Sequence, residues 1–340
     1  MRKITSIIML TALLCTNVHG TNQIMLFTGN ANIELAQKVA EYLEIPLGSA
    51  LVKEFNDGEI RIHVQESVRG QDVYIVQPTC QNDSQSVNDN LMELFLLVRT
   101  MKRASAASIT AVIPYYGYAR QDRKTTSRVP ISAADIALLL ETAGIDRLVT
   151  VDLHCGQIQG FFRNVPVDNL FASTLFVSYI ESKGLENIVV VSPDAGGVER
   201  AKKFSESLNK RGIETDMALI SKERAQAGVV ASMNLIGCVE GCCAIIIDDL
   251  CDTGGTLVKA AQLLKDNGAS RVFAIVTHPV FSGQALEKIR NSVLEEMITS
   301  DTIPLRGEVP SNVHLISVAP LLGEAIRRID QGESISVLFE

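Results

Sequence analysis

Short apolar runs alternate with stretches of helical periodicity along almost the whole chain. The apolar runs predict strands at residues 24–27, 73–76, 109–113, 148–151, 188–191, 245–247 and 272–276. Between them, apolar positions recur at helical spacing and predict helices at residues 33–43, 88–103, 133–143, 198–209 and 257–265. An alternation of this kind is typical of α/β folds with mainly parallel sheets.

The chain is long enough for two domains. It has 340 residues, of which 46% are hydrophobic, and one domain per roughly 150 residues is the usual expectation. A boundary near Asn169 leaves predicted strands on both sides, so we expect an N-terminal domain at residues 23–169 and a C-terminal domain at residues 170–340. The last segment of the chain is expected to pack back on the first domain.

The composition indicates which kinds of partner the protein binds. The formal net charge is −8, and no stripe of lysine and arginine compensates it, which argues against a nucleic-acid partner. The seven cysteines are scattered, and they lack the paired spacing of a zinc site. We therefore expect small-molecule partners and reduced, mostly buried thiols.

The segment at residues 244–256 carries the strongest chemical signal. An apolar run ends in two aspartates, and a glycine-bearing turn then leads into a predicted helix. Backbone N–H groups at a helix N-terminus favour an anion, glycines let the backbone approach it, and threonines add hydroxyl donors. Carboxylates suit sugar hydroxyls or an accompanying metal. The segment therefore predicts a site for a phosphorylated sugar, formed by Asp248, Asp249, Asp252, Thr253, Gly254, Gly255 and Thr256.

This segment resembles the ribose-phosphate-binding loop shared by phosphoribosyltransferases and ribose-phosphate pyrophosphokinases. Residues 114–124 and 128–132 resemble the ATP-binding and flexible-loop region of the pyrophosphokinases, and at least five separated motifs follow that family's order between Met25 and Glu340. The resemblance implies two phosphoribosyltransferase-like domains, each with a mainly parallel sheet flanked by helices. It also implies transfer of the diphosphoryl group of ATP to the anomeric hydroxyl of ribose 5-phosphate, with release of AMP, for nucleotide biosynthesis.

Two basic segments fit this reaction. Residues 120–128 are rich in arginine and lysine, and such a segment is either a solvated loop or a mobile cover for a polyphosphate. The resemblance favours the second interpretation and implies ATP contacts from Arg120, Gln121 and Asp122. It also matches Lys222 and Arg224 to the family's catalytic cations, which phosphoryl transfer requires for charge neutralisation.

The segment at residues 55–59 has two interpretations. Its Asp-Gly pair predicts a hairpin turn, whereas a phenylalanine followed by carboxylates also suits an adenine platform. The resemblance implies adenine contacts delivered to a neighbouring subunit, by Phe55, Asp57 and Glu59.

A metal site is predicted at two strand ends. His154 follows the predicted strand at residues 148–151, and Asp194 follows the strand at residues 188–191. Mg²⁺ prefers few protein ligands together with phosphate and water oxygens, which suits so sparse a pair. The resemblance implies that the matching histidine and aspartate contact the metal.

The resemblance also bears on assembly and regulation. Residues 332–339 resemble the serine-containing tail that helps to bind phosphate or ADP in the regulated class of the family, and the implied assembly is a homohexamer built from dimers. Two alternatives to the pyrophosphokinase are a phosphoribosyltransferase and a non-catalytic regulatory homologue. A phosphoribosyltransferase would share the loop at Asp248 but lack the Phe55 segment and the Lys222 and Arg224 pair.

The N-terminus raises a question of location. Arg2 and Lys3 precede an apolar run and a plausible cleavage site at Gly20, as in a secretory signal peptide, and the run is too short to span a bilayer. Alternatively, residues 1–22 are a mis-annotated leader and Met25 is the true start. Since the implied reaction uses ATP, we expect a cytoplasmic protein with no membrane partner.

Overall fold

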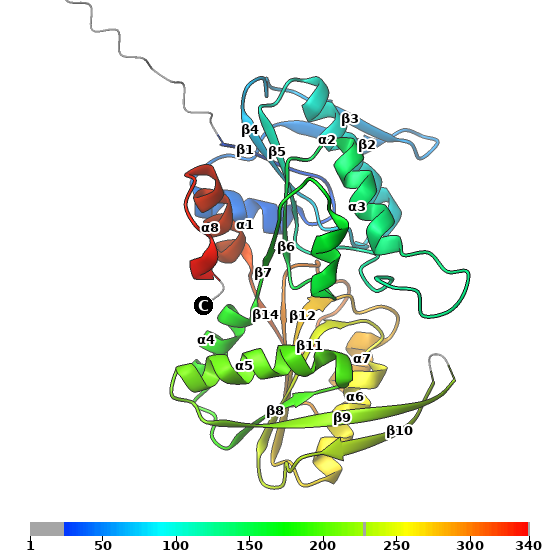
Figure 1. Cartoon of the computed structure of the whole chain (residues 1–340), viewed down its shortest axis with the longest axis vertical. Coiled ribbons are helices and arrows are strands. Elements are labelled where there is room, and N and C mark those ends of the chain that lie inside the picture. The colour runs from blue at the N-terminus through cyan, green and yellow to red at the C-terminus, as the bar shows by residue number, and fades with distance from the viewer. Residues whose placement is uncertain (1–23, 227–228, 339–340) are drawn as a thin grey trace, which may run out of the picture.

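The computed structural model describes residues 24–226 and 229–338, so the predicted leader at residues 1–22 lies outside it (Figure 1). The described residues form two extended sheets and a separate two-stranded hairpin. None of the helices in these two ranges is long and apolar enough to cross a membrane. Every described cysteine is a free thiol.

The first sheet has five parallel strands in the order β1-β4-β5-β6-β7. These strands are β1 (Ile24–Thr28), β4 (Asp72–Val76), β5 (Ser108–Ile113), β6 (Arg147–Val151) and β7 (Val167–Leu170). Alternate side chains of β5 enter two different cores, Val112 on one face and Ala111 and Ile113 on the other. Burial on both faces explains why the central strands β4, β5 and β6 are mainly apolar. The helices that follow β1, β4 and β5 are α1 (Ile33–Leu43), α2 (Val87–Arg103) and α3 (Ser132–Ala143).

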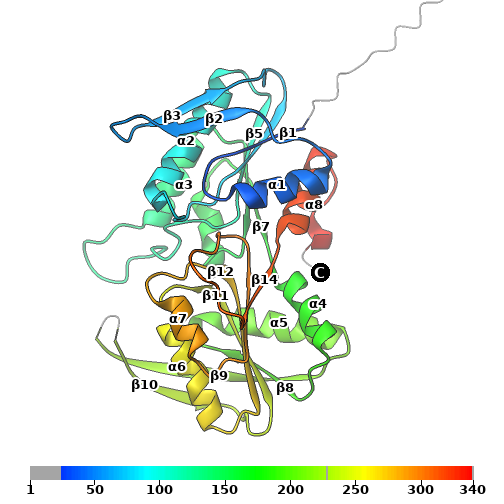
Figure 2. The same ribbon diagram turned by 180° about the vertical axis from the view of Figure 1, so that it is seen from behind.

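The second sheet has seven strands in the order β10-β9-β8-β11-β12-β13-β14, and only β10 runs antiparallel to its neighbour. Its strands are β8 (Ile188–Ser192), β9 (Thr215–Gln226), β10 (Val229–Ile236), β11 (Cys243–Cys251), β12 (Arg271–Pro279), β13 (Glu296–Ser300) and β14 (Val313–Ile316). The helices of this half are α4 (Ser173–Lys183), α5 (Val198–Lys210), α6 (Gly255–Asp266) and α7 (Ala285–Arg290) (Figure 2). The expected α/β class with parallel sheets flanked by helices is confirmed.

Several boundaries differ from the expectation, and two of these differences involve predicted site residues. The strand predicted at residues 245–247 continues as β11 through Asp248 and Asp249 to Cys251, because it pairs with β12 as far as Pro279. The strand that carries Lys222 continues to Gln226 and pairs with β10, which the apolar pattern did not predict.

The C-terminal helix α8 (Ala319–Asp330) packs against α1, as Figures 1 and 2 show from opposite sides. Tyr42 of α1 donates a hydrogen bond to Glu324 of α8 at 3.2 Å, and Leu35 and Leu322 belong to the same apolar core. The chain therefore returns to its first sheet after completing the second. The division into two domains near Asn169 stays a prediction.

Candidate active site

The carboxyl ends of strands from both sheets meet at one contact. His154 follows β6 of the first sheet, and its Nδ1 lies 2.7 Å from Oδ2 of Asp249 in β11 of the second sheet. Asp249 is almost fully buried, with 3% of its surface exposed. Ligands of α/β proteins bind at the carboxyl ends of parallel strands, so this contact marks the place where both sheets can act on one substrate.

Arg200 of α5 lies between the two aspartates of β11. Its Nη1 is 3.4 Å from Oδ1 of Asp248 and 3.3 Å from Oδ1 of Asp249. Arg200 was not predicted as a site residue, and the only signal for it in the sequence is its position in the first turn of a helix that follows a strand end. The guanidinium places a cation beside two adjacent carboxylates and reduces their mutual repulsion.

The two carboxylates have unequal proton affinities. Burial, followed by the charge of Asp249, raises the pKa of Asp248. Burial would also raise the pKa of Asp249, but the hydrogen bond to His154 and the charge of Arg200 outweigh it and lower that pKa. In turn, the hydrogen bond to Asp249 raises the pKa of His154 against the opposing effect of burial. Asp249 is thus a fixed anion, whereas Asp248 takes up a proton more readily.

The predicted sugar-phosphate loop connects β11 to α6. Gly254 precedes the helix with φ of +73°, a left-handed conformation that glycine adopts without strain, and a Cβ at this position would lie 3.4 Å from the backbone of Ala285. Helix α6 directs the positive end of its dipole toward this turn. Lys288 donates to the carbonyl oxygen of Thr253 at 2.9 Å, which fixes the turn from the side of α7.

The predicted ATP loop reaches this turn. Arg120 Nη1 lies 2.7 Å from Oδ2 of Asp252, and Ser282 also donates to the Asp252 carboxylate. Burial would raise the pKa of Asp252, but the bonds from Ser282 and Arg120 outweigh it and lower the pKa. Gln121 accepts a bond from Ser132 at the start of α3, which fixes the base of the loop, and the charge of Asp122 acts on His154.

Asp194 lies at the end of β8, before the short helix η2 (Ala195–Gly197). Its Oδ1 accepts from the backbone N–H groups of Gly196 at 3.0 Å and Gly197 at 3.2 Å, which makes it an N-cap, and its charge contributes to the raised pKa of Asp248. Among residues 24–226 and 229–338, His, Cys, Asp and Glu side chains form no group of three or more that could hold a metal. The joint metal role of His154 and Asp194 stays a prediction.

The chemistry of these two side chains is nevertheless compatible with a divalent metal. A histidine whose Nδ1 donates to a carboxylate presents Nε2 to a metal, and His154 is fixed in this way by Asp249. Mg²⁺ keeps several waters or phosphate oxygens, so two protein ligands beside acidic strand ends are sufficient.

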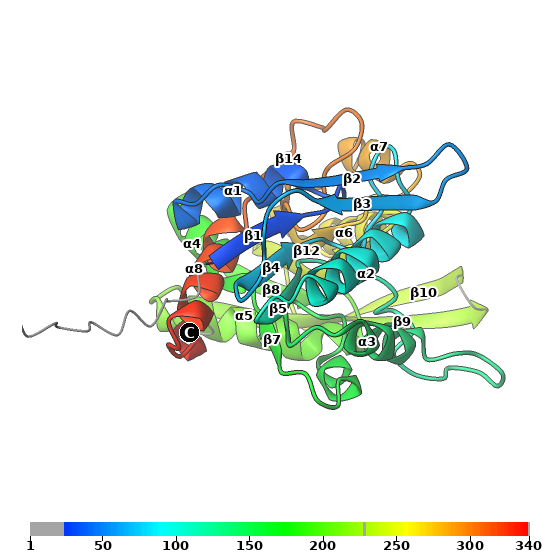
Figure 3. The same cartoon turned by 90° about the horizontal axis from the view of Figure 1, so that it is seen from above.

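The segment at residues 55–59 forms the tip of a hairpin between β2 (Ala50–Glu54) and β3 (Ile60–Val64). Phe55 N–H donates to Glu59 O at 2.8 Å, and Asp57 Oδ1 accepts from Glu59 N–H at 3.1 Å. The predicted hairpin turn is confirmed. Half of the Phe55 surface is exposed (50%), and Figure 3 shows this hairpin extending to the same side of the molecule as the β9–β10 hairpin. Its contact with adenine stays a prediction.

Lys222 and Arg224 both lie in β9, where their backbones pair with Met233 and Val230 of β10. Their side chains lie outside the described part of the structure. Strand β9 pairs with β8 as far as Leu219 beside Ser192, and it contacts η2. The two residues therefore belong to the stretch of β9 that continues past the end of β8, where Asp194 lies.

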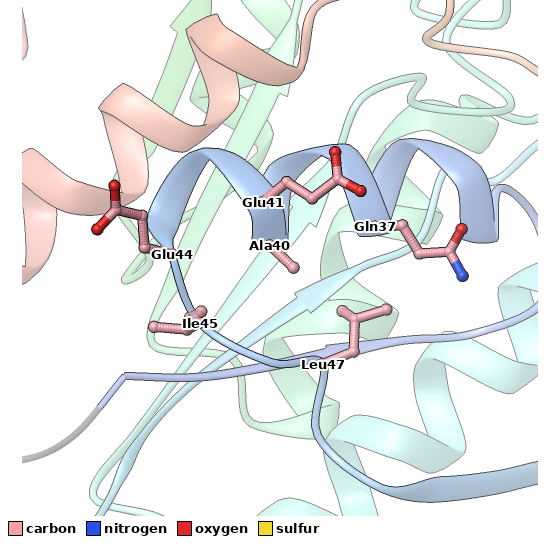
Figure 4. Close-up of a pocket in the computed structure, with 6 residues that line it drawn as sticks. All are labelled: Gln37, Ala40, Glu41, Glu44, Ile45 and Leu47. Carbon is pink, nitrogen blue, oxygen red and sulfur yellow. The ribbon is translucent and has the colours of Figure 1, made fainter.

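A surface hollow lies elsewhere, beside α1. It has a volume of about 620 Å³ and is lined by Gln37, Ala40, Glu41, Glu44, Ile45 and Leu47 (Figure 4). None of these residues belongs to the predicted site, and the hollow lies along α1 and the loop after it rather than at the strand ends that carry His154 and Asp249. Its lining residues include apolar side chains and two carboxylates but no cation. The hollow therefore does not suit an anion such as phosphate.

Comparisons with known proteins agree with the motifs. Residues 24–144 match the N-terminal domain of ribose phosphate pyrophosphokinase, and residues 220–340 match the phosphoribosyl synthetase-associated domain. Ribose-phosphate pyrophosphokinases of Wolinella succinogenes and Vibrio parahaemolyticus are each 52% identical to the chain, over 92% of this chain and 98% of theirs. The crystal structure of phosphoribosylpyrophosphate synthetase from Mycobacterium smegmatis is 40% identical and has a TM-score of 0.83, covering 92% of this chain and 100% of that one. The chain therefore belongs to the ribose-phosphate pyrophosphokinase family.

Proposed function

We propose that the chain transfers the diphosphoryl group of ATP to the anomeric hydroxyl of ribose 5-phosphate, which gives 5-phospho-α-D-ribose 1-diphosphate and AMP. The observation that carries this proposal is the convergence of two contacts between the sheets. His154 meets Asp249, and Arg120 of the predicted ATP loop meets Asp252 of the predicted sugar-phosphate loop. A transfer between two phosphorylated substrates requires both loops at one place.

Ribose 5-phosphate occupies the end of β11. The phosphate binds at the turn from Asp252 through Thr253, Gly254, Gly255 and Thr256 to the start of α6, where backbone N–H groups and hydroxyls are donors. Asp248 and Asp249 accept from the ribose hydroxyls, and Arg200 keeps these two carboxylates in place. The anomeric hydroxyl then faces the bound ATP.

The transfer is an in-line attack of the anomeric oxygen on the β-phosphorus of ATP. Lys222 and Arg224 are the catalytic cations that neutralise the charge of the transition state, with Arg120 as a third. ATP is bound by Arg120, Gln121 and Asp122, and adenine by Phe55, Asp57 and Glu59 of a neighbouring subunit. AMP leaves with the electron pair of the broken P–O bond.

Bound Mg²⁺ would supply charge neutralisation on the triphosphate. His154 would hold the ion through Nε2, since Nδ1 is engaged by Asp249, and Asp194 would be the carboxylate ligand. Asp249 also keeps the imidazole ring in one orientation. The remaining proposals rest on the family resemblance alone: a homohexamer built from dimers, regulation by phosphate and ADP, and a cytoplasmic location.

An assay of AMP release tests the proposal. We expect AMP to form only when ATP and ribose 5-phosphate are both present, in a 1:1 ratio with the phosphoribosyl pyrophosphate product. Transfer of phosphoribosyl pyrophosphate to a nucleobase would instead identify a phosphoribosyltransferase. Binding of both substrates without AMP release would identify a non-catalytic homologue.

The metal ligands are tested by His154→Ala and Asp194→Asn. Each variant should lower turnover by about 10- to 100-fold and raise the Mg²⁺ concentration needed for half-maximal rate, because each removes one metal ligand. Asparagine is chosen at position 194 because its side-chain oxygen can still cap the Gly196 and Gly197 N–H groups.

Asp194→Ala serves as the comparison, since it also loses the cap and should cost about 1 kcal/mol of stability. Activity against Mg²⁺ and thermal melting should be measured together for all three variants. Unchanged kinetics in both His154→Ala and Asp194→Asn would remove these residues from the metal role.

The N-terminal interpretation is tested by a chain that begins at Met25. We expect it to fold, assemble and retain full activity, because it loses only the first residue of β1, Ile24, and no proposed site residue. Residues 1–20 should also be fused to a reporter that works only after export, and the N-terminus of the native protein should be sequenced. Efficient export with cleavage after Gly20 would overturn the cytoplasmic location.

A further inference from the structure

A buried polar cluster lies directly behind His154. Asp152, two residues earlier, directly follows β6 with φ of +42°, a left-handed conformation that few residues other than glycine adopt, although Asp and Asn tolerate it. Only 7% of its surface is exposed. A turn held in this conformation needs contacts that fix it from outside.

The outside contacts come from the second sheet. Thr277 Oγ1 donates to Oδ2 of Asp152 at 2.7 Å, and Nε2 of His278 lies 3.1 Å from the Asp152 carbonyl oxygen. Ala172 N–H, at the start of α4, also donates to Oδ2 at 3.0 Å. Thr277 and His278 are consecutive residues of β12, and both are 3% exposed. The carboxylate and the carbonyl of Asp152 are thus held by the same strand.

His278 is itself fixed in one tautomer. A carbonyl oxygen can only accept, so Nε2 carries the proton that bonds to Asp152. Burial lowers the pKa of His278 and keeps the ring neutral, so Nδ1 accepts from the hydroxyl of Thr302 at 2.9 Å. The Tyr115 ring packs edge-on against His278 with a centroid distance of 5.0 Å. Tyr115 begins the segment that leads to Arg120. The His278 ring therefore lies between that segment and the turn at Asp152.

The register of the second sheet links this cluster to the catalytic contact. Strand β12 pairs with β11, with Val276 beside Asp248 and His278 beside Leu250, so Thr277 lies next to Asp249. Two neighbouring strands therefore hold one turn of the first sheet at two points. Asp249 holds His154, and Thr277 and His278 hold Asp152.

We propose that Thr277 and His278 are positioning residues, which set the His154 ring against Asp249 by fixing the turn at Asp152 across the two sheets. This inference rests on the proposed function, since it assigns His154 a part in turnover. A purely structural role for the cluster would instead affect folding stability without acting through His154.

Thr277→Val is the informative variant, because it keeps the shape of the side chain and removes only the donated hydrogen bond. The chain offers a matched control in Thr299 of β13, which lies beside Val276, is fully buried, and has no hydrogen-bond partner for its hydroxyl among the described residues. Thr277→Val should lower kcat by about 10-fold and raise the Mg²⁺ requirement, with the KM for ribose 5-phosphate changed by about 2-fold or less. Thr299→Val should leave all three unchanged.

A double-mutant cycle separates positioning from general stability. In a His154→Ala background, Thr277→Val should cost about 2-fold or less, because the residue it positions is already absent. An equal loss in both backgrounds, or wild-type kinetics in Thr277→Val, would overturn the inference. If His154→Ala alone kept full activity, the proposed function of the site would fail instead, so the two failures are distinguishable.

The contact between His278 and the Asp152 carbonyl oxygen gives a second, independent pair of variants. These variants test the positioning role even if Thr277→Val does not fold. His278→Gln keeps an N–H donor for the Asp152 carbonyl, whereas His278→Met fills similar volume without one. We expect His278→Gln to retain most of the turnover that His278→Met loses. Equal turnover in the two variants would contradict the positioning role of His278.

Discussion

Replacing Lys222 and Arg224 together with alanine should reduce turnover by at least about 100-fold while changing ribose 5-phosphate binding far less. Both residues lie in the stretch of β9 that continues past the end of β8. One strong electrostatic contact to a transition state is worth on the order of 3 kcal/mol, which corresponds to about 100-fold in rate. The measurement is kcat and KM for each substrate, with ribose 5-phosphate binding determined separately by calorimetry.

A control for the loss of two positive charges is available on α5. Lys202 and Lys203 are exposed and pair with glutamates of their own helix, at 3.7 Å to Glu206 and 3.0 Å to Glu199. Replacing these two lysines with alanine removes the same charge and should leave kcat unchanged. Near-normal turnover in the Lys222 and Arg224 double variant, or an equal loss in the control, would defeat the catalytic assignment.

The sequence was sufficient to predict the parallel strands because of how they are buried. In β8 and β11 alternate apolar residues enter two different buried cores, so the runs are continuous and unambiguous. Helix boundaries at α1 and α3 were also close to the prediction, since both helices end at left-handed residues, Glu44 and Gly144.

The β9–β10 hairpin could not be predicted in the same way. Ile220 of β9 is buried in a core, but beyond Leu219 the strand no longer pairs with β8 and continues to Gln226 by backbone pairing with β10. The charged residues at 222–224 interrupt the apolar pattern that would mark a strand. Strands β13 and β14 are short and partly polar, so they also lack a clear apolar run.

The acidic residues of the candidate site stand out in the sequence because each follows or ends an apolar run, where a polar residue is unusual. Arg200 was not, because it stands among the other charged residues of α5, including Glu199 and Lys202. On sequence alone it belongs to a solvated helix face. Only the packing of α5 beside β8 and β11 shows that this one cation faces Asp248 and Asp249.

Arg200→Gln is therefore expected to raise the KM for ribose 5-phosphate by about 30-fold or more. Arg200 is partly buried and Asp249 almost fully buried, and removing one partner of such a charge pair costs about 2 kcal/mol or more, mainly because the remaining charge is left uncompensated. Arg200 lowers the pKa of both Asp248 and Asp249, so its loss lets the pair keep a proton to higher pH. The acidic limb of the kcat/KM profile should accordingly move to higher pH, and Arg200→Lys should lie between wild type and Arg200→Gln.

Arg147→Gln is the matched control. Arg147 pairs with Asp168 at 2.6 Å, but it lies at the first residue of β6, at the opposite end of the strand from His154. Its loss should lower the melting temperature without changing the KM or the pH profile. If Arg200→Gln behaved like this control, the carboxylates of β11 would bind ribose without the guanidinium, and Arg200 would serve only to stabilise the packing of α5 against the sheet.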